Sequence, residues 1–312
     1  MKKGFLLIAA VAGLILAGCG QTKSAATSSS AATRVVKTTT GNVKIPTHPK
    51  RVVSTVYSPE LLSLGVHVVG ATSLDLQSPW LSKTDTKGIK DLGNAMNAEA
   101  ILKLKPDLIV TCNEGDVKKL KDIAPVLYIP FGSTGDAYQT LTKFGDLLNR
   151  KAQAKKVTTA LKTTAKQATT KLTKAGITPS KTTISLFDMQ SNKLYVDGSS
   201  WGRGGEALVT LMGFKLTTEG QKVQDGAGYK QISTESLPTY AGDWLFFSNT
   251  TATATGNDQA IDDMKGNPVW QGLAAVKNNH VVSLPFNKMY YSDPYALKGQ
   301  VKLITTTMLK QN

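Results

Sequence analysis

A stretch of 26 residues without proline or glycine, residues 150–175, constrains the fold more than any other part of the sequence. Apolar or small side chains recur along it every three or four residues, which places them on one face of an α-helix. At about 1.5 Å per residue, such a helix would be about 39 Å long. Gly176 and Pro179 come just after it and predict where it ends. We therefore expect one long helix, residues 150–176, to connect two folded parts.

The segments before and after this helix share one order of elements. In each, short apolar stretches alternate with helical patterns, which indicates α/β units around parallel sheets. Glu99 lies as far before the stretch that begins at Asp107 as Glu235 lies before the stretch that begins at Asp243. We predict an α/β fold of two related Rossmann-like lobes joined by one long α-helix. The expected strands are residues 51–56, 67–71, 107–111 and 126–129 in the first lobe, and 183–187, 244–248 and 280–284 in the second.

The N-terminus has the pattern of an export signal. Lys2 and Lys3 precede an apolar run, residues 5–16, that is too short to span a membrane. Cys19 directly follows Leu-Ala-Gly, an arrangement that resembles the bacterial lipobox, in which the cysteine receives a diacylglyceryl group. The Ser/Thr/Ala-rich segment after it favours a flexible tether. We expect a signal peptide at 1–18, the lipidated cysteine and tether at 19–40, an N-terminal lobe at 41–149 and a C-terminal lobe at 177–312.

The formal net charge of +15 raises nucleic acid as a partner. Nine Lys and Arg residues and no acidic residue lie between Leu147 and Phe187, so most of the excess belongs to the long helix and the residues just after it. Basic and aromatic residues are segregated along the chain, whereas a nucleic-acid reader combines them on one surface. We therefore expect no nucleic-acid partner and assign the charge to a solvated helix face.

Two motifs in the second half are typical of enzymes. Gly198–Gly202 fits the G-x-S-x-G nucleophile elbow around Ser200, with Asp243 and His280 after it in hydrolase order. The glycines that follow Ser200 interrupt the helix that this elbow needs, so a Ser200 hydrolase is only a remote alternative. Gly202–Ala207 also fits a dinucleotide fingerprint, but it does not directly follow a strand.

Metal and thiol chemistry have equally little support. The sequence contains no zinc or iron motif, so we expect no metal site, no cofactor and no enzymatic activity. Cys112 has no partner cysteine once Cys19 is acylated, and we expect it to be a small buried thiol.

The glycine-rich segment after residue 197 is better suited to binding a ligand. Glycines allow a backbone to approach a ligand closely. Tyr195, Trp201 and Arg203 supply two flat apolar faces and a planar group of hydrogen-bond donors within nine residues. Tyr290 and Tyr291 belong to a second aromatic cluster near the C-terminus.

Several motifs resemble those of ABC-transporter substrate-binding lipoproteins for iron–siderophore complexes, the helix-linked class that also carries haem and cobalamin. The resemblance runs from about Gly41 to the C-terminus and implies a ligand cleft between the lobes. The matching segments are Pro46–Val53, Leu64–Val66, Leu102–Leu108 and Gly266–Trp270.

A narrower set of motifs resembles the Gram-positive ferric hydroxamate binders. The resemblance implies that Arg203 donates hydrogen bonds to hydroxamate oxygens, while the aromatic residues pack around the chelate. Phe131 stands where that group often has a tyrosine. Glu99 and Glu235 match the two carboxylates that dock to arginines of the permease. The matching segments are Trp201–Glu206, Tyr240–Asp243 and Asp293–Tyr295, and the implied cleft residues are Tyr195, Trp201, Arg203, Tyr290, Tyr291 and Phe131.

Charge supports the same ligand class. Ferric tris-hydroxamates are neutral or singly positive, so one arginine among aromatic residues suits them better than it suits the highly anionic ferric tris-catecholates. The siderophore itself holds the iron. We expect a monomeric lipoprotein that is anchored through Cys19 to the outer face of the cell membrane, in a Gram-positive organism, and delivers a ferric hydroxamate siderophore to an ABC permease. The alternatives are a catecholate siderophore, haem or cobalamin in the same fold, the Ser200 hydrolase, and a surface adhesin.

Overall fold

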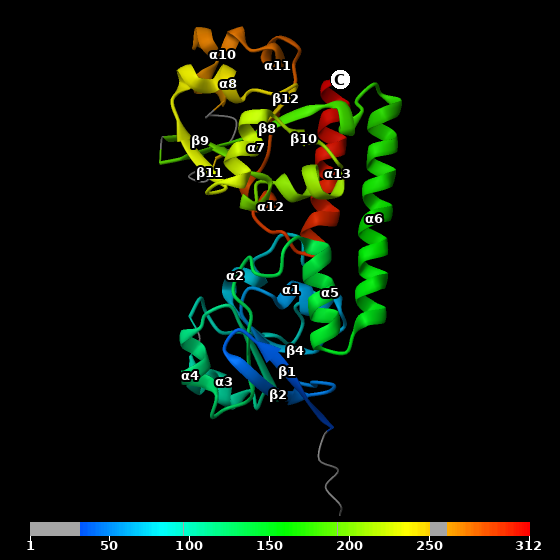
Figure 1. Ribbon diagram of the computed structural model, residues 1–312, viewed down its shortest axis with the longest axis vertical. Helices are drawn as coiled ribbons and strands as arrows, with labels where there is room; N and C mark the ends of the chain where they lie inside the picture. Colours follow the sequence, from blue (N-terminus) through cyan, green and yellow to red (C-terminus); the bar gives the residue numbers. More distant parts are fainter. Residues whose placement is uncertain (1–31, 96, 192, 250–260) are drawn as a thin grey trace, which may run out of the picture. The chain divides into compact units, whose positions relative to one another are not determined.

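The computed structural model describes residues 32–95, 97–191, 193–249 and 261–312 (Figure 1). The predicted signal peptide at 1–18 and Cys19 lie outside these residues. One sheet forms from residues before the long helix α6 (Lys151–Lys174) and another from residues after it. This arrangement confirms the predicted α/β fold with a single long helix between the two halves.

The sheet of the N-terminal lobe has five parallel strands in the order β5-β4-β3-β6-β7. Every residue of its central strands is buried. Such strands are short and almost wholly apolar because helices cover both faces of a parallel sheet. The strands are β3 (Val52–Ser54), β4 (Val68–Ala71), β5 (Lys90–Asp91), β6 (Leu108–Thr111) and β7 (Val126–Tyr128), and the helices are α1 (Ser58–Ser63), α2 (Ser73–Leu76), α3 (Ala98–Lys103), α4 (Gly115–Leu120) and α5 (Ala137–Leu147).

An antiparallel hairpin precedes this sheet, with β1 (Thr33–Thr38) paired to β2 (Gly41–Pro46). Val36 and Ile45 are buried in the same apolar core as α1 and α5. Their burial offsets the entropy of ordering the segment. Residues 33–40, which the sequence assigns to the tether, are therefore strand and turn, and the ordered lobe begins earlier than the predicted boundary at residue 41.

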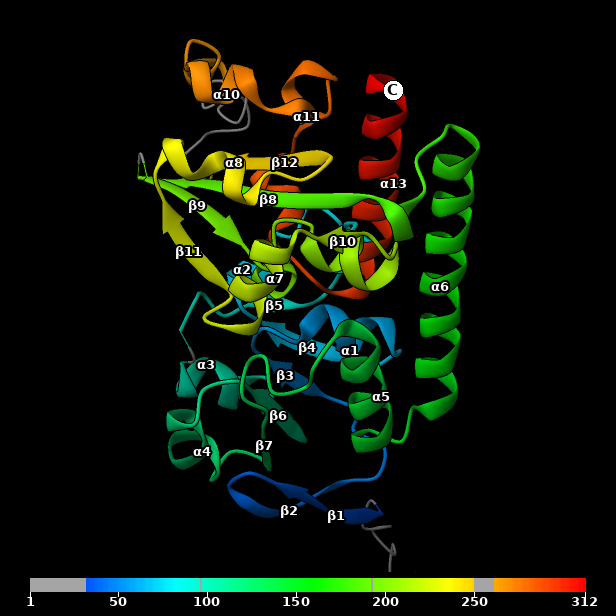
Figure 2. The same cartoon turned by 45° about the horizontal axis from the view of Figure 1, so that its top comes forward.

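The C-terminal lobe has a mixed sheet in the order β11-β9-β8-β12-β13, with β10 paired to β8. Figure 2 labels its strands from β8 to β12. Strands β8, β10, β12 and β13 are parallel, whereas β9 and β11 are antiparallel to their neighbours. Only β8, β12 and β13 are among the predicted strands; of the others, β10 has two residues, and β11 is largely exposed and has no apolar run to reveal it. The strands are β8 (Thr183–Gln190), β9 (Lys193–Asp197), β10 (Lys215–Leu216), β11 (Tyr229–Ile232), β12 (Trp244–Asn249) and β13 (Val281–Ser283), and the α-helices are α7 (Thr218–Asp225), α8 (Leu237–Tyr240), α10 (Pro268–Gly272), α11 (Ala274–Lys277), α12 (Phe286–Met289) and α13 (Pro294–Gln311).

The two lobes repeat a core of parallel strands. The order β4-β3-β6-β7 of the first lobe corresponds to β10-β8-β12-β13 of the second. The carboxylate of Asp107, just before β6, accepts hydrogen bonds from the backbone N–H groups of Lys50 and Arg51, at 2.7 and 2.9 Å, beside the start of β3. The carboxylate of Asp243, just before β12, accepts one from Thr183 N–H at 2.7 Å, at the start of β8. The repeat predicted from the sequence is thus a repeat of structure.

Helix α6 packs against α5 of the first lobe and against the C-terminal helix α13 (Figure 1). Its buried stripe consists of Ala154, Leu161, Ala165, Ala168 and Leu172, and its lysines are exposed. One apolar cluster runs from Val36 in the hairpin to Met308 in α13 and joins the lobes through these helices, and each lobe also has an apolar cluster of its own. In the part of the chain that the structure describes, no helix is both long enough and apolar enough to cross a membrane.

Candidate functional site

The glycine-rich loop after β9 has an unusual backbone that the packing around it requires. Gly202, Arg203 and Gly204 have φ values of +84°, +54° and +80°. For a residue with a side chain such as Arg203, this conformation costs about 1–3 kcal/mol and persists only where the surroundings hold it. A Cβ atom on Gly205 would lie 2.6 Å from the Ser199 carbonyl oxygen, so only glycine fits there. The loop therefore fixes the position of Arg203.

The guanidinium of Arg203 is bound inside the lobe. Its Nη2 lies 2.6 Å from Asp188 Oδ2, its Nε donates to the same oxygen at 2.8 Å, and its Nη1 donates to the Trp201 carbonyl oxygen at 3.1 Å. The guanidinium carbon also lies 5.1 Å from the centre of the Phe286 ring, a cation–π distance. The Arg203 side chain is only 10% exposed and that of Asp188 is fully buried.

A second carboxylate, Asp197, lies beside this pair at the end of β9. Its Oδ2 is 3.8 Å from Arg203 Nε, and neither of its buried oxygens has a hydrogen-bond partner. Burial and the neighbouring charge of Asp188 raise the pKa of Asp197 to about 7, although Arg203 acts in the opposite direction. One guanidinium thus faces two buried carboxylates, neither of which was among the predicted site residues.

Aromatic rings surround this ion cluster on its own lobe. Trp201 is 41% exposed and stacks on Tyr229, with ring centres 4.6 Å apart. The ring centre of Tyr195 lies 6.3 Å from that of Tyr229, because β9 and β11 are paired. Tyr229 escaped the sequence prediction because it lies on the strand β11, which the pattern did not reveal. The rings form an exposed aromatic surface.

The predicted tyrosine pair lies after α12. Tyr290 packs edge-on against Phe286 and Tyr291, at 5.5 and 5.1 Å, and it is 41% exposed. Tyr291 donates a hydrogen bond to the Leu74 carbonyl oxygen of the N-terminal lobe at 3.0 Å. Burial raises the pKa of Tyr291 to about 12. Phe286 connects this pair to Arg203, so the structure brings together Tyr290, Tyr291 and Arg203.

The N-terminal lobe has a hollow of about 400 Å³ beside Leu74, at the carboxyl ends of β3, β4 and β6. The strand order reverses between β3 and β6, and ligands of open α/β sheets bind at such a point. Cys112 is half-buried there, and burial raises the pKa of its thiol. The sequence did not indicate this hollow, because its lining is polar and comes from several loops. It is formed by Thr55, Val56, Thr72, Leu74, Asn94, Ala95, Cys112, Asn113, Asp116 and Lys119.

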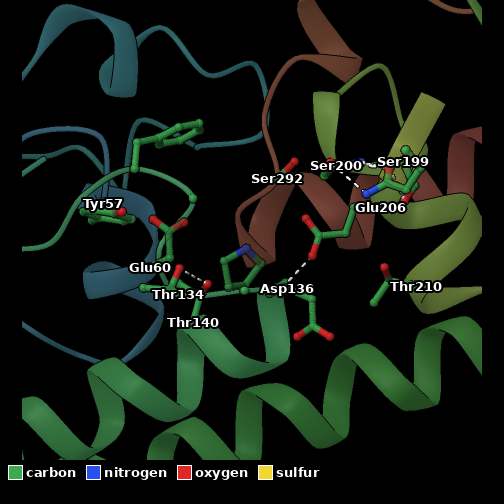
Figure 3. Close-up of a pocket in the computed structure, with 16 residues that line it drawn as sticks. Tyr57, Glu60, Thr134, Asp136, Thr140, Ser199, Ser200, Glu206, Thr210 and Ser292 are labelled. Atoms are coloured by element: carbon green, nitrogen blue, oxygen red, sulfur yellow. Dashed lines mark hydrogen bonds between the residues drawn. The ribbon is translucent and has the colours of Figure 1, made fainter. Parts of the chain in front are cut away.

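A second cavity of about 400 Å³ is lined by both lobes (Figure 3). Phe131, which is 78% exposed, lines it from the first lobe, and Ser199 and Ser200 line it from the loop that carries Trp201. The other predicted cleft residues are not among its lining residues. Its lining includes the carboxylates of Glu60, Asp136 and Glu206 and no basic side chain.

Two of these carboxylates occupy equivalent places in the two lobes. Glu206, in the second lobe, accepts a hydrogen bond from Ala137 N–H, the first residue of α5, at 2.5 Å. Glu60, in the first lobe, lines the same cavity as Pro294, the first residue of α13. Proline has no N–H group, and Glu60 Oε2 has no hydrogen-bond partner. Burial raises the pKa of Glu206 to about 7, and burial with the charge of Asp293 raises that of Glu60.

Comparisons with known proteins decide the family. Residues 60–288 match the family model described as periplasmic binding protein. The chain belongs to the periplasmic binding protein family. YxeB, an iron(3+)-hydroxamate-binding protein of Bacillus subtilis, is 35% identical over 320 residues, which cover 100% of this chain and 98% of that protein. FhuD, another iron(3+)-hydroxamate-binding protein of Bacillus subtilis, is 34% identical over 98% of this chain and 95% of its own length.

Solved structures agree with this membership. The FhuD protein from S. pseudintermedius superposes with a TM-score of 0.74 at 27% identity, over 89% of this chain and 98% of that one. FhuD2 from Staphylococcus aureus with bound ferrioxamine B superposes with a TM-score of 0.70 at 28% identity, over 84% and 99%. Members of the periplasmic binding protein family are extracytoplasmic components of ABC transporters that bind ligands for transport and are not enzymes.

The hydrolase alternative is not assembled in this periplasmic binding protein. Within the described residues, the Ser200 hydroxyl exchanges hydrogen bonds with Gln224. His280 stacks on Trp244 at 4.1 Å and contacts the Asp243 carbonyl oxygen rather than its carboxylate. The described ranges also contain no group of three or more His, Cys, Asp or Glu side chains that could hold a metal ion.

Glu99 and Glu235 lie where the repeat predicts. Glu99 is exposed in the first turn of α3, shortly before β6. Glu235 is exposed in a short 3-10 helix, Thr234–Ser236, shortly before β12. A hydrogen bond from Ser233 lowers the pKa of Glu235, so its side chain is negatively charged at neutral pH. The two lobes of this periplasmic binding protein therefore each present one exposed glutamate at equivalent positions.

Proposed function

We propose that this protein captures ferric hydroxamate siderophores and delivers them to an ABC permease. The observation that carries the proposal is the juxtaposition of Arg203 with exposed aromatic rings on the C-terminal lobe, next to the contact between Tyr291 and Leu74. Leu74 also lines the polar hollow of the N-terminal lobe. A ligand held there would touch both lobes. The names of the relatives YxeB and FhuD support the ligand class.

The chemistry of the surface suits a hydroxamate chelate. Trp201, Tyr229 and Tyr290 offer flat apolar faces for the hydrocarbon linkers of such a complex. Arg203 uses its Nε, Nη1 and Nη2 for internal bonds, but each Nη carries a second N–H. Those two N–H groups are the donors that we assign to hydroxamate oxygens. Tyr195 and Phe131 complete the proposed contacts from the two lobes.

The same proposal covers the attachment and the docking of the protein. Acylated Cys19 would hold the protein on the outer face of the cell membrane, and YfiY, a relative that is 29% identical, is named a probable siderophore-binding lipoprotein. Glu99 and Glu235 would pair with arginines of the permease. A Cys19→Ala variant should no longer be found in the membrane fraction, and its affinity for the ligand should be unchanged. Glu99→Ala and Glu235→Ala should keep affinity and lose uptake.

A fluorescence titration with ferric siderophores tests the ligand class. Ferrioxamine B and ferrichrome should quench the tryptophan emission with saturation, because Trp201 is exposed at the proposed site, whereas Trp80 is half-buried and Trp244 and Trp270 are buried. Trp201→Phe is the matched control, since it retains an aromatic face and should lose the part of the quenching that Trp201 reports. Absence of saturable quenching and of binding by calorimetry for both complexes would refute the proposal. Preferential binding of a catecholate complex, haem or cobalamin would replace it.

A further inference from the structure

Asp188 and Asp197 do not belong to the set of ligand-binding residues proposed above, yet both contact its only basic side chain. Asp188 binds the Arg203 guanidinium at 2.6 and 2.8 Å, and it accepts further hydrogen bonds from Gln190 at 2.8 Å and Ser248 at 3.3 Å. It is therefore well supported as an anion. One such partner is sufficient to hold an arginine in place.

Asp197 adds a charge without adding a hydrogen bond. It is fully buried, lies 3.8 Å from Arg203, and has no hydrogen-bond partner for either oxygen. Burial of a carboxylate in this way costs free energy, so folding alone does not explain its presence. Above its pKa of about 7, Asp197 is ionised, and this second negative charge outweighs the single positive charge of Arg203.

We propose that Asp188 and Asp197 are specificity-determining residues, whose two negative charges outweigh the charge of Arg203, so that it offers hydrogen-bond donors to neutral or cationic ferric complexes while the cluster disfavours anionic ones. This inference rests on the proposed function. Asp188 acts by holding the guanidinium, and Asp197 acts through its charge. Ferric complexes of citrate or catecholates are anionic, so the excess negative charge of the cluster repels them.

The buried setting makes the charge effective. The Arg203 side chain is 10% exposed and both carboxylates are fully buried, so water screens the cluster poorly. At an effective dielectric of about 20 and a separation of about 8 Å, removal of one unit charge changes the affinity for a singly charged ligand by a factor of about 30. A neutral complex should be almost unaffected.

The test compares three complexes at pH 8 by calorimetry: ferrioxamine B, a cation; ferrichrome, which is neutral; and ferric citrate, an anion. Asp197→Asn removes the charge and no hydrogen bond, and Asp262→Asn, at an exposed position of the same lobe, is the matched control. We expect Asp197→Asn to change the affinity ratio of ferric citrate to ferrioxamine B at least tenfold in favour of citrate. Ferrichrome affinity should change less than threefold, and Asp262→Asn should change neither quantity.

Other results overturn the inference. An unchanged ratio overturns it, and so does an equal loss of affinity for all three complexes, which would indicate a merely structural role for Asp197. Asp188→Asn is a second variant that keeps a carbonyl oxygen toward Arg203 and should shift the ratio in the same direction. If the unmodified protein binds neither ferrioxamine B nor ferrichrome, the proposed function itself fails. If it binds them and the ratio does not move, only the charge inference fails.

Discussion

The burial of Glu206 at the start of α5 predicts that the stability of the protein depends on pH. The folded protein raises the pKa of this carboxyl from 4.5 to about 7, chiefly by burial and further by the charge of Asp136. The hydrogen bonds from Ala137 N–H and Ser292 act in the opposite direction but do not prevent the rise. The folded state therefore binds a proton more tightly than the unfolded chain does.

The direction in which the free energy of unfolding changes with pH follows from this difference in proton binding. The stabilisation from the protonated carboxyl is complete below pH 4.5 and is lost as the pH rises through about 7. One pKa unit corresponds to about 1.4 kcal/mol, so the shift is equivalent to about 3 kcal/mol. Because Glu206 is partly exposed, we expect about 2–3 kcal/mol. Asp75, Asp197 and Asp293 also have raised pKa values, of about 6, 7 and 6, and add losses of the same sign.

The Glu206→Gln variant isolates the contribution of Glu206 to the pH dependence of stability. Glutamine keeps a carbonyl oxygen that accepts the Ala137 N–H, and it cannot ionise. Guanidinium unfolding should give the variant and the unmodified protein similar free energies of unfolding at pH 5. At pH 8 the variant should be more stable by about 2–3 kcal/mol. Glu114→Gln, at an exposed position, is the control and should show no such gain.

The outcome that refutes the reasoning is equally plain. If the unmodified protein and Glu206→Gln lose the same free energy of unfolding between pH 5 and pH 8, the buried carboxyl does not titrate as described. A variant that is less stable at both pH values would mean that the carboxylate contributes more through its hydrogen bonds than it costs through burial.

Three further substitutions have expected outcomes. Arg203→Ala leaves Asp188 and Asp197 buried without a cation and should lower the free energy of unfolding by about 3–5 kcal/mol in chemical denaturation; a loss below about 1 kcal/mol would contradict the ion cluster. Leu161→Ala removes a buried side chain of α6 and should cost about 2–5 kcal/mol by the same assay, whereas Lys162→Ala beside it, exposed, should cost less than about 1 kcal/mol. Gly299→Ala places a methyl group where the Trp80 ring lies against α13, so it should displace Trp80 and shift its emission, and an unchanged spectrum would show that the ring is seated elsewhere.

Much of the fold could be predicted because its signals are local. The α6 stripe and the buried strands β6, β7 and β12 have local apolar patterns that indicate a helix face and buried strands. Strand β11 was missed because it is exposed and depends on pairing to β9, which the sequence does not encode as a pattern. Strand β9 was missed although its Leu194 and Val196 are buried. The hairpin β1–β2 was missed because the Ser/Thr-rich segment before it led to the assignment of a tether, although Val36 and Ile45 are buried.

The site was only partly predictable for a related reason. Trp201 and Arg203 could be found because a run of glycines lies beside them in the sequence. Asp188, Asp197 and Phe286 reach Arg203 from three separate elements, and the hollow beside Leu74 is assembled from the ends of several strands. Contacts of this kind arise from the topology of the fold, so they do not appear in the sequence as a motif with a regular spacing. The match of Phe131 to an aromatic position came only from the family resemblance.

The apolar cluster that runs from Val36 to Met308 affects how cooperatively the protein unfolds. Two lobes joined by a bare linker could melt one after the other, each with its own midpoint. Here α6 and α13 complete the core of both halves, so loss of either half exposes apolar surface in the other. We therefore expect the lobes to unfold as one cooperative unit, so calorimetry should record one transition whose van't Hoff and calorimetric enthalpies agree.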